Sequence, residues 1–199
     1  GNNYINRNMV GAVVGVNPFG GQGLSGTGPK AGGPNYMTRF ARERIVVQSQ
    51  VSPGESPAAG SASGAIISAE VVAQPTDEQI TATFDAAAAI QLDWNLAGGD
   101  QRALLLDKAA EQLEERLPGH HACAGVLRYY ADQARQKCQA PLQLPGPTGE
   151  LNELSLHGRG VFFCAVEDGA PDHAFVQQIA AALAAGNTVI ACPAAGREA

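Results

Sequence analysis

The chain of 199 residues lacks several features that would place it in a specialised class of protein. No apolar run approaches the ~20 residues that a helix needs to cross a membrane. Basic clusters are missing too: 13 Lys and Arg stand against 19 Asp and Glu, and the net charge of −6 argues against nucleic acid as a partner. The first residues, Gly-Asn-Asn-Tyr, lack the charged segment and apolar core of a signal peptide, so we expect none.

Cysteine is also scarce, and the four residues at positions 123, 138, 164 and 192 form no C-x-x-C pair. We expect them to be reduced, small apolar side chains of a cytoplasmic protein. Cys164 lies inside an apolar run and Cys192 ends another, so we predict that both pack rather than act as nucleophiles. His120 and His121 have no further ligands at zinc spacing, and we therefore predict no metal site.

Glycine, in contrast, is concentrated in the first 36 residues, where an apolar run, Val10–Val16, leads into a glycine-rich loop. Glycine has no Cβ and accepts positive φ, which suits backbone that passes close to a ligand or to another segment. Gly21–Gly26 fits the dinucleotide pattern G-x-G-x-x-G, but that motif needs a strand before it and a helix after it. Because Asn17-Pro18 precedes the glycines and Pro29 follows them, we reject the dinucleotide interpretation.

A change of composition divides the chain. Met37–Gln50 interleaves arginines with apolar residues, which predicts an extended, charged edge strand. Residues 51–63 are rich in Pro, Ser, Gly and Ala, as is typical of a linker, and a short strand is expected over Ala65–Ala73. We therefore expect a first domain over 1–50, a linker over 51–75 and a second domain over 76–199.

Helices are predicted beyond the linker. Thr76 and Gln79 form a capping box that starts a helix ending near Trp94. Asp100 is the expected N-cap of a second helix, which Pro118-Gly119 ends. A third helix follows, and its apolar side comprises Val126, Leu127, Tyr130, Ala131 and Ala134.

The last part of the sequence predicts a βαβ unit. Gly160–Val166 is a continuous apolar run, as expected for a strand that is buried on both faces. Asp172 is the expected cap of a helix that Gly186 closes, and Thr188–Cys192 is a second buried strand. A right-handed crossover would make the two strands parallel neighbours. The fold class is therefore α/β.

Two groups of motifs resemble the aldehyde dehydrogenase superfamily. The first group resembles the C-terminal end of the glutamate-semialdehyde dehydrogenase module in the proline utilization A family. Its members are Asn3–Asn8, Gly11–Gly15, Pro18–Gly21 and Leu24–Pro34. The second group resembles the N-terminal half of such a module. Its members are Gln101–Ala110, Leu127–Ala131, Gly158–Phe162 and Ala180–Ala191.

The first resemblance implies a substrate-binding loop, the aldehyde-anchor loop of the family. The backbone N–H groups of Gly11 and Ala12 would hold the α-carboxylate of glutamate semialdehyde, and Phe19 would pack against its aliphatic stem. On the residues alone, the alternative is that these three positions make a tight turn and fill a core. No catalytic residue is expected within the chain, because the family's reactive Cys lies in a motif upstream of such a segment.

The second resemblance implies a copy of the fold without the chemistry. Where the family has Pro-Trp-Asn-Phe-Pro, with an Asn that holds the oxyanion, this chain has Gly169 within Glu167–Pro171. Cys192 takes the place of the lysine that contacts the cofactor ribose, and Asp168 adds negative charge near the expected position of the phosphates. We therefore predict that residues 76–199 form a truncated, inactive scaffolding domain.

The resemblance implies NAD for the dehydrogenase module of the parent enzyme and FAD for its proline dehydrogenase module, with neither bound by this chain alone. The expected partners are the upstream catalytic modules, glutamate semialdehyde and a second copy reached through the strand expected over Met37–Gln50, which corresponds to the flap strand of the family. The parent is expected to be cytoplasmic, with peripheral attachment to a membrane left open. The alternative is a stand-alone assembly module that has the aldehyde dehydrogenase fold and no activity.

Overall fold

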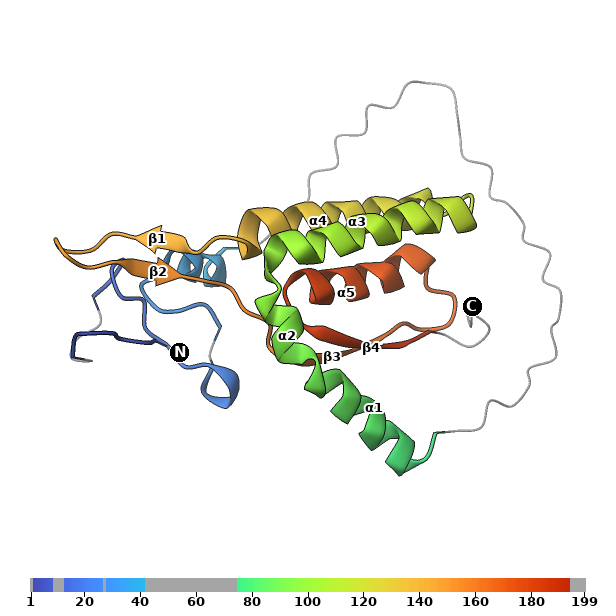
Figure 1. Cartoon of the computed structure of the whole chain (residues 1–199), viewed down its shortest axis with the longest axis horizontal. Helices are drawn as coiled ribbons and strands as arrows, with labels where there is room; N and C mark the ends of the chain where they lie inside the picture. Colours follow the sequence, from blue (N-terminus) through green and yellow to red (C-terminus); the bar gives the residue numbers. More distant parts are fainter. Residues whose placement is uncertain (1, 9–12, 27, 42–74, 194–199) are drawn as a thin grey trace, which may run out of the picture. The chain divides into compact units, whose positions relative to one another are not determined.

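The computed structural model describes residues 2–8, 13–26, 28–41 and 75–193 (Figure 1). The chain divides into two compact units, Gly1–Ala73 and Gln74–Ala199. Residues 51–74 of the expected linker, together with the strand expected over Ala65–Ala73, lie outside the described residues. The division into 1–50, 51–75 and 76–199 stays a prediction.

The described residues of the first unit form loops and two short 3-10 helices, η1 (Gly23–Ser25) and η2 (Pro34–Arg39). An extended strand from Met37 was expected, and this is wrong for Met37–Arg39, which belongs to η2. Proline at the first position of η2 presets a helical φ. The rings of Tyr36 and Phe40 also meet edge to face, with centroids 5.4 Å apart. Residues 42–50 of that expected strand lie outside the described part.

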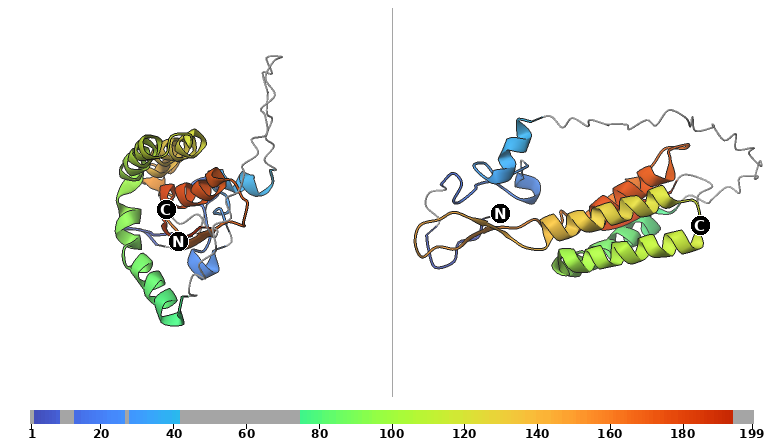
Figure 2. Two further views of the ribbon diagram at one scale, coloured as in Figure 1. Left: turned by 90° about the vertical axis from the view of Figure 1, so that its right-hand side faces the viewer. Right: turned by 90° about the horizontal axis from the view of Figure 1, so that it is seen from above.

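The second unit combines five α-helices and four strands within its described residues, which confirms the α/β class. Its elements are α1 (Asp77–Ala89), α2 (Gln91–Leu96), α3 (Gly98–Arg116), α4 (His121–Cys138), β1 (Leu142–Leu144), β2 (Asn152–Leu154), β3 (Val161–Ala165), α5 (Asp172–Ala184) and β4 (Thr188–Cys192). The helices α3 and α4 run side by side and pack on α5, which contacts β3 and β4 (Figure 1, Figure 2). Among the described residues, no helix is both long and apolar enough to span a bilayer.

The capping box at the start of α1 is confirmed. The Thr76 N–H donates to Gln79 Oε1 over 2.9 Å, and the Gln79 N–H donates to Thr76 Oγ1 over 3.3 Å. The helix was expected to continue to Trp94, but a break at Ile90 separates α1 from α2.

The other two expected caps are wrong. The helix α3 begins at Gly98, and the side chain that serves its first turn is distant in sequence: Gln139 Oε1 accepts from the N–H of Asp100 over 2.8 Å. At α5 the N-cap is Pro171, and Asp172 is the first helical residue. The Asp172 carboxylate lies 3.5 Å from Nε2 of His120, at the start of α4. The ends of α3 at Pro118-Gly119 and of α5 at Gly186 agree with the prediction.

Small side chains make the interface between α3 and α4. The buried residues on these two helices include Ala103, Ala110, Ala124, Ala131 and Ala134. The predicted apolar side of α4 is confirmed, since Leu127 is buried and Val126 and Tyr130 pack against the core. At Gly99 a Cβ would overlap with the carbonyl oxygen of Ala134, so only glycine permits this close approach.

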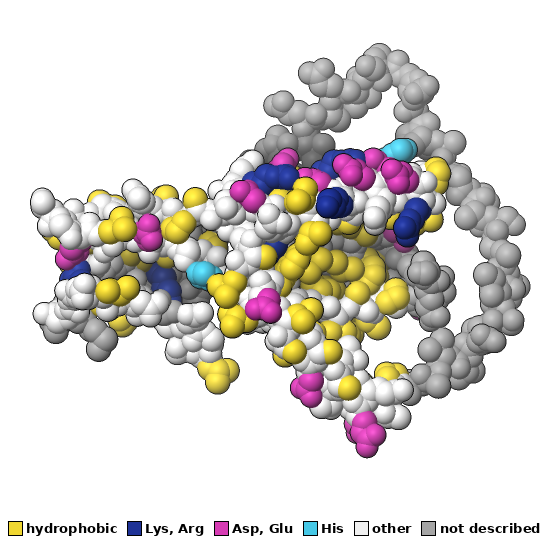
Figure 3. All heavy atoms as spheres, viewed as in Figure 1, with side chains coloured by type: hydrophobic (Ala, Val, Ile, Leu, Met, Phe, Trp, Pro, Cys, Tyr) yellow, Lys and Arg dark blue, Asp and Glu magenta, His cyan; other side chains and the backbone are white. Residues whose placement is uncertain are grey.

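Charged side chains gather over the outer surface of α3 and α4 (Figure 3). Arg128 forms a two-pronged ion pair with Glu114, with N–O distances of 2.7 and 2.6 Å. This guanidinium holds the pKa of Glu114 below its usual range. Because both groups are exposed to solvent, such pairs add little stability and serve mainly to keep this surface in water.

The strands β3 and β4 are parallel neighbours, as predicted, with Val161 opposite Thr188 and Ala165 opposite Cys192. The expectation of burial on both faces is wrong. Cys164 is 3% exposed, whereas Phe162 is 38% and Phe163 is 58% exposed. The helices α5 and α1 contact the pair but leave these rings uncovered within the described structure.

A short antiparallel hairpin, β1–β2, was not predicted. Leu142 pairs with Leu154, and Leu144 pairs with Asn152. Its turn contains Gly149 at φ +89°, and the Glu150 N–H donates to the Pro147 carbonyl over 3.1 Å. The strands are three residues long, too short for alternation to reveal them.

A buried arginine joins the helices to one another. Arg102 of α3 is 1% exposed. Its Nε donates to the carbonyl of Ala184, in the last turn of α5, over 3.1 Å. Its Nη1 donates to the carbonyl of Asn95 over 2.8 Å and, less closely, to that of Trp94 over 3.4 Å, in the last turn of α2. A positive charge at two helix C-termini is favourable, because unpaired carbonyls gather there.

A buried asparagine continues this connection to the sheet. Asn187 follows α5, and its Oδ1 accepts from the N–H groups of Arg159 and Gly160, at 2.5 and 3.1 Å, just before β3. Its Nδ2 donates to the carbonyl of Ala182 over 3.1 Å. The start of β3 is therefore fixed to the end of α5 by a side chain rather than by the strand ladder alone.

Replacing Gly99 should test the close approach of α3 and α4. We expect Gly99→Ala to lower the free energy of unfolding by about 1–3 kcal/mol, because the new methyl group overpacks the interface. The matched control is Gly125→Ala in α4, where a Cβ meets nothing within 4 Å. That change should raise stability by about 0.5–1 kcal/mol through helix propensity. Urea unfolding followed by the fluorescence of Trp94, the single tryptophan, measures both. Equal effects would contradict the proposed packing.

Removing the charge of Arg102 should strongly destabilise the second unit. We expect Arg102→Met to lower the free energy of unfolding by about 2–4 kcal/mol, because the carbonyls of Ala184, Asn95 and Trp94 lose their donor. Arg116→Met, at an exposed position of the same helix, should change it by less than about 0.5 kcal/mol. The same urea titration applies, and a small effect at position 102 would show that water replaces the guanidinium.

Candidate functional site

The loop around Phe19 is the first candidate site. Phe19 and Ala31 form an isolated antiparallel bridge, with N–H to carbonyl distances of 3.0 and 2.8 Å. The Phe19 side chain is 65% exposed, so its ring is presented to solvent rather than buried in a core. Gly11 and Ala12, the other two expected substrate residues, lie outside the described residues. Their role, like that of Phe19, stays a prediction.

Close approach of backbone explains two of the glycines in this loop. The Gly15 N–H donates to the carbonyl of Gly32 over 2.8 Å. Gly32 has φ +72°, and a Cβ there would lie 3.2 Å from the Cα of Val14. At Gly33 a Cβ would lie 2.9 Å from the Cβ of Pro18. These positions favour glycine because two arms of the loop lie against each other.

The hexapeptide Gly21–Gly26 folds as a turn around η1. Ser25 Oγ donates to the Gln22 carbonyl over 3.0 Å and accepts from the Gln22 N–H over 3.3 Å. In the described residues on either side there is neither a strand leading in nor an α-helix leading out. The local structure agrees with rejecting a dinucleotide motif here.

The second candidate is the carboxyl edge of β3 and β4, the place where parallel sheets bind nucleotides. The residues that follow β3 are Glu167 and Asp168, both exposed, and a turn with Gly169 at φ +83°. At the end of β4 stands Cys192, also exposed rather than packed as expected. Two carboxylates oppose a pyrophosphate, and neither Gly169 nor Cys192 offers a cationic or amide side chain. These features favour the prediction that this chain alone binds no NAD, which stays a prediction.

Known proteins resemble this chain over most of its length. No family model matches the chain. The bifunctional protein PutA of Klebsiella aerogenes is 37% identical over 190 residues, which are 96% of this chain and 11% of that protein. A solved structure of proline utilization A (PutA) from Bradyrhizobium japonicum matches at 35% identity with a TM-score of 0.58, over 63% of this chain and 15% of the other. The chain is a PutA-family segment of the aldehyde dehydrogenase superfamily.

A second relative has a higher sequence identity to this chain, over a shorter stretch. The 1-pyrroline-5-carboxylate dehydrogenase of Bacillus pumilus is 62% identical over 46 residues, which are 23% of this chain and 9% of that enzyme. The PutA-family segment thus spans a small part of each relative. These matches show the fold and the family.

A serine–histidine contact in the second unit invites comparison with a hydrolase. Ser155 Oγ lies 2.8 Å from His157 Nε2, and His157 Nδ1 lies 3.2 Å from Asn95 Nδ2. Asn95 Oδ1 accepts the N–H of Gly158 over 2.7 Å, which turns its amide nitrogen toward the histidine. His157 Nδ1 is then an acceptor. Nε2 carries the hydrogen and donates a hydrogen bond to Ser155 Oγ. A general base needs the opposite tautomer, so this trio is structural.

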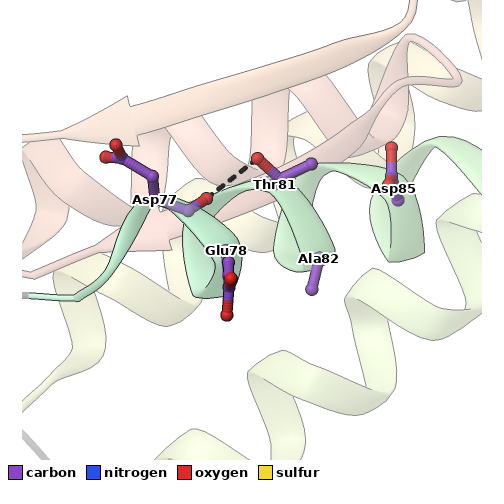
Figure 4. Close-up of a pocket in the computed structure, with 5 residues that line it drawn as sticks. All are labelled: Asp77, Glu78, Thr81, Ala82 and Asp85. Carbon is purple, nitrogen blue, oxygen red and sulfur yellow. Dashed lines mark hydrogen bonds between the residues drawn. The ribbon is translucent and has the colours of Figure 1, made fainter.

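An acidic depression lies on α1 and is lined by Asp77, Glu78, Thr81, Ala82 and Asp85 (Figure 4). The carboxylates of Asp77 and Glu78 point in different directions, and Thr81 Oγ1 donates to the carbonyl of Asp77 over 2.8 Å. No group of three metal-binding side chains occurs in the described part of the chain. Asp77 and Glu78 instead stabilise the N-terminus of α1 by their charge.

Two of the thiols are unsuited to nucleophilic chemistry. Burial raises the pKa of Cys164 and of Cys123, and the nearby Asp172 carboxylate raises that of Cys123 further. Both residues are buried among apolar neighbours, as predicted for Cys164. A raised pKa leaves the thiol protonated near neutral pH, and the thiol is a poor nucleophile in that form.

We expect no binding of NAD by this chain in isothermal titration calorimetry at up to millimolar cofactor, because the carboxyl edge of β3 and β4 is acidic. A complete PutA protein serves as the positive control. In the variant Glu167→Gln/Asp168→Asn the repulsion is removed but no cationic ligand is gained, so binding that appears only in this variant would identify the acidic charge as the cause. A dissociation constant in the micromolar range for the unmodified chain would contradict the assignment.

Proposed function

We propose that this chain is part of a bifunctional enzyme of proline catabolism, whose dehydrogenase module oxidises L-glutamate γ-semialdehyde to glutamate with NAD. The observation that carries the proposal is the combination of two matches. One runs along 96% of the chain to bifunctional protein PutA, and the other is a short match of 62% identity to a 1-pyrroline-5-carboxylate dehydrogenase. 1-Pyrroline-5-carboxylate is the cyclic form of glutamate semialdehyde.

In this proposal the first unit supplies the aldehyde-anchor loop. Gly11 and Ala12 would hold the α-carboxylate by backbone N–H groups, where small side chains leave room for the anion. Phe19 would cover the methylene stem of the semialdehyde. Its exposure of 65% supports this role, since a ring that fills a core would be buried. The reactive cysteine, the general base and NAD, which accepts the hydride, would belong to the upstream modules.

The second unit is proposed to be a non-catalytic scaffold. The acidic residues Glu167 and Asp168 at the edge where a dinucleotide would bind support this role. The uncovered rings of Phe162 and Phe163 also support this role, because a scaffold needs apolar surface to pack on its neighbours. In the parent enzyme it would cover the catalytic modules and help to seal a path for the semialdehyde.

The remaining partners follow from the same proposal. The upstream proline dehydrogenase module would hold FAD, and a second copy of the enzyme would associate through the predicted flap strand at the end of the 1–50 domain. A cytoplasmic enzyme is proposed, with attachment to the membrane surface as a property of the parent. The alternative function is a stand-alone assembly module without activity.

A chimera distinguishes the enzyme segment from the assembly module. The matched segment of the Klebsiella aerogenes PutA is replaced by this chain, and NADH formation from glutamate semialdehyde is followed by absorbance. We expect activity, and we expect Phe19→Ala to raise KM by about tenfold because the ring contacts the methylene stem. Phe40→Ala is the matched control, since Phe40 is 79% exposed in the same unit.

Two results would count against the proposal. A chimera that folds, by circular dichroism and gel filtration, but forms no NADH would favour the assembly module. Equal effects of Phe19→Ala and Phe40→Ala would remove Phe19 from the substrate site while leaving the enzyme assignment intact.

A further inference from the structure

The backbone beneath Phe19 is held at four consecutive carbonyl groups. Asn2 Nδ2 donates to the carbonyl of Pro18 over 2.6 Å, and the Ala31 N–H donates to that of Phe19 over 2.8 Å. Lys30 Nζ donates to the carbonyls of the next two residues, at 2.7 Å for Gly20 and 2.6 Å for Gly21. The part of the loop that carries the exposed ring is therefore fixed on both sides.

Lys30 contributes most to this arrangement. Its ammonium group is charged and lies within hydrogen-bond distance of two adjacent carbonyls, and hydrogen bonds from a charged donor are roughly twice as strong as neutral ones. The side chain is half-buried, so water competes less well for these donors. Lys30 also precedes Ala31, so the residue that pairs with Phe19 and the residue that holds Gly20 and Gly21 are neighbours.

Gly20 makes this contact possible. A Cβ at position 20 would lie 3.1 Å from Cδ of Lys30, closer than ordinary van der Waals contact. The lysine stem thus lies directly over the backbone of residue 20, and its tip reaches the next carbonyl. Glycine at this position is explained by the lysine rather than by positive φ.

We propose that Lys30 is a positioning residue for substrate binding, which locks the loop so that the Phe19 ring meets the aliphatic part of the semialdehyde in one orientation. This inference rests on the proposed function and adds a residue to it. A ring on a fixed backbone loses less freedom when a ligand binds, and this pre-organisation is gained as affinity. A lysine that only closes a turn would leave substrate affinity unchanged when it is lost.

The first test measures the loop itself in the 199-residue chain. Hydrogen exchange at the amides of Phe19 and Ala31 is followed by NMR in Lys30→Met, which keeps the stem and removes the donors. We expect exchange to accelerate by about tenfold or more, because the local opening loses the charged hydrogen bonds. Lys30→Arg should retain most of the protection, and Lys108→Met, an exposed lysine on α3, should change nothing. Unchanged exchange in Lys30→Met overturns the proposal, whatever the activity is.

The second test measures substrate affinity in the chimera with PutA. We expect Lys30→Met to raise KM for glutamate semialdehyde by about fivefold to tenfold while kcat changes by less than about twofold. The double variant Phe19→Ala/Lys30→Met should have the KM of Phe19→Ala alone, because a positioning residue acts through the group that it positions. Additive effects would overturn the proposal, as would an unchanged KM beside accelerated exchange.

The two tests separate two kinds of failure. If the unmodified chimera folds but forms no NADH, the proposed function fails, and the exchange data alone decide whether Lys30 fixes the loop. If the chimera is active and Lys30→Met alters neither exchange nor KM, the proposed function stands and the role of Lys30 is refuted.

Discussion

The second unit depends on one buried cation that has main-chain carbonyls as partners. Arg102 donates to the last turns of α2 and α5, so one side chain of α3 fixes two helix ends. A buried charge is costly unless hydrogen bonds satisfy it, and here the carbonyl oxygens at the helix C-termini do so. Asn187 extends the connection to the start of β3. The position of the sheet is therefore fixed by hydrogen bonds to the helices as well as by the pairing of its own strands.

The fold could be predicted from the sequence where the signal is local. The Thr76 capping box, the apolar side of α4 and the pairing of β3 with β4 depend on residues that are close in sequence or on long periodic runs. Predictions failed where a distant residue decides. The first turn of α3 takes its side-chain partner from Gln139 rather than from Asp100, and no local rule indicates this. Burial of β3 also depends on which elements cover its two faces. The apolar sequence of β3 therefore predicted more burial than the structure shows.

The candidate site shows the same division. The resemblance to the family predicted Phe19 as a substrate-binding residue. The structure places this residue on an exposed, hydrogen-bonded loop. Lys30 and Asn2 escaped notice, because a lysine or an asparagine in a glycine-rich loop carries no sign of which carbonyls it will reach. The only usable signal was Gly20, where a missing Cβ leaves space for a neighbouring stem. Arg102 was missed for a related reason: an arginine within a helix looks like a surface residue until its depth is known.

The uncovered rings on β3 have a practical consequence for handling the protein. Phe162 and Phe163 lie on a parallel sheet that, among the described residues, has two strands and two open edges. Exposed strand edges of this kind tend to pair with those of other copies of the chain. The isolated polypeptide should therefore aggregate and become turbid as it is concentrated. A polar residue in place of Phe163 would then improve its solubility.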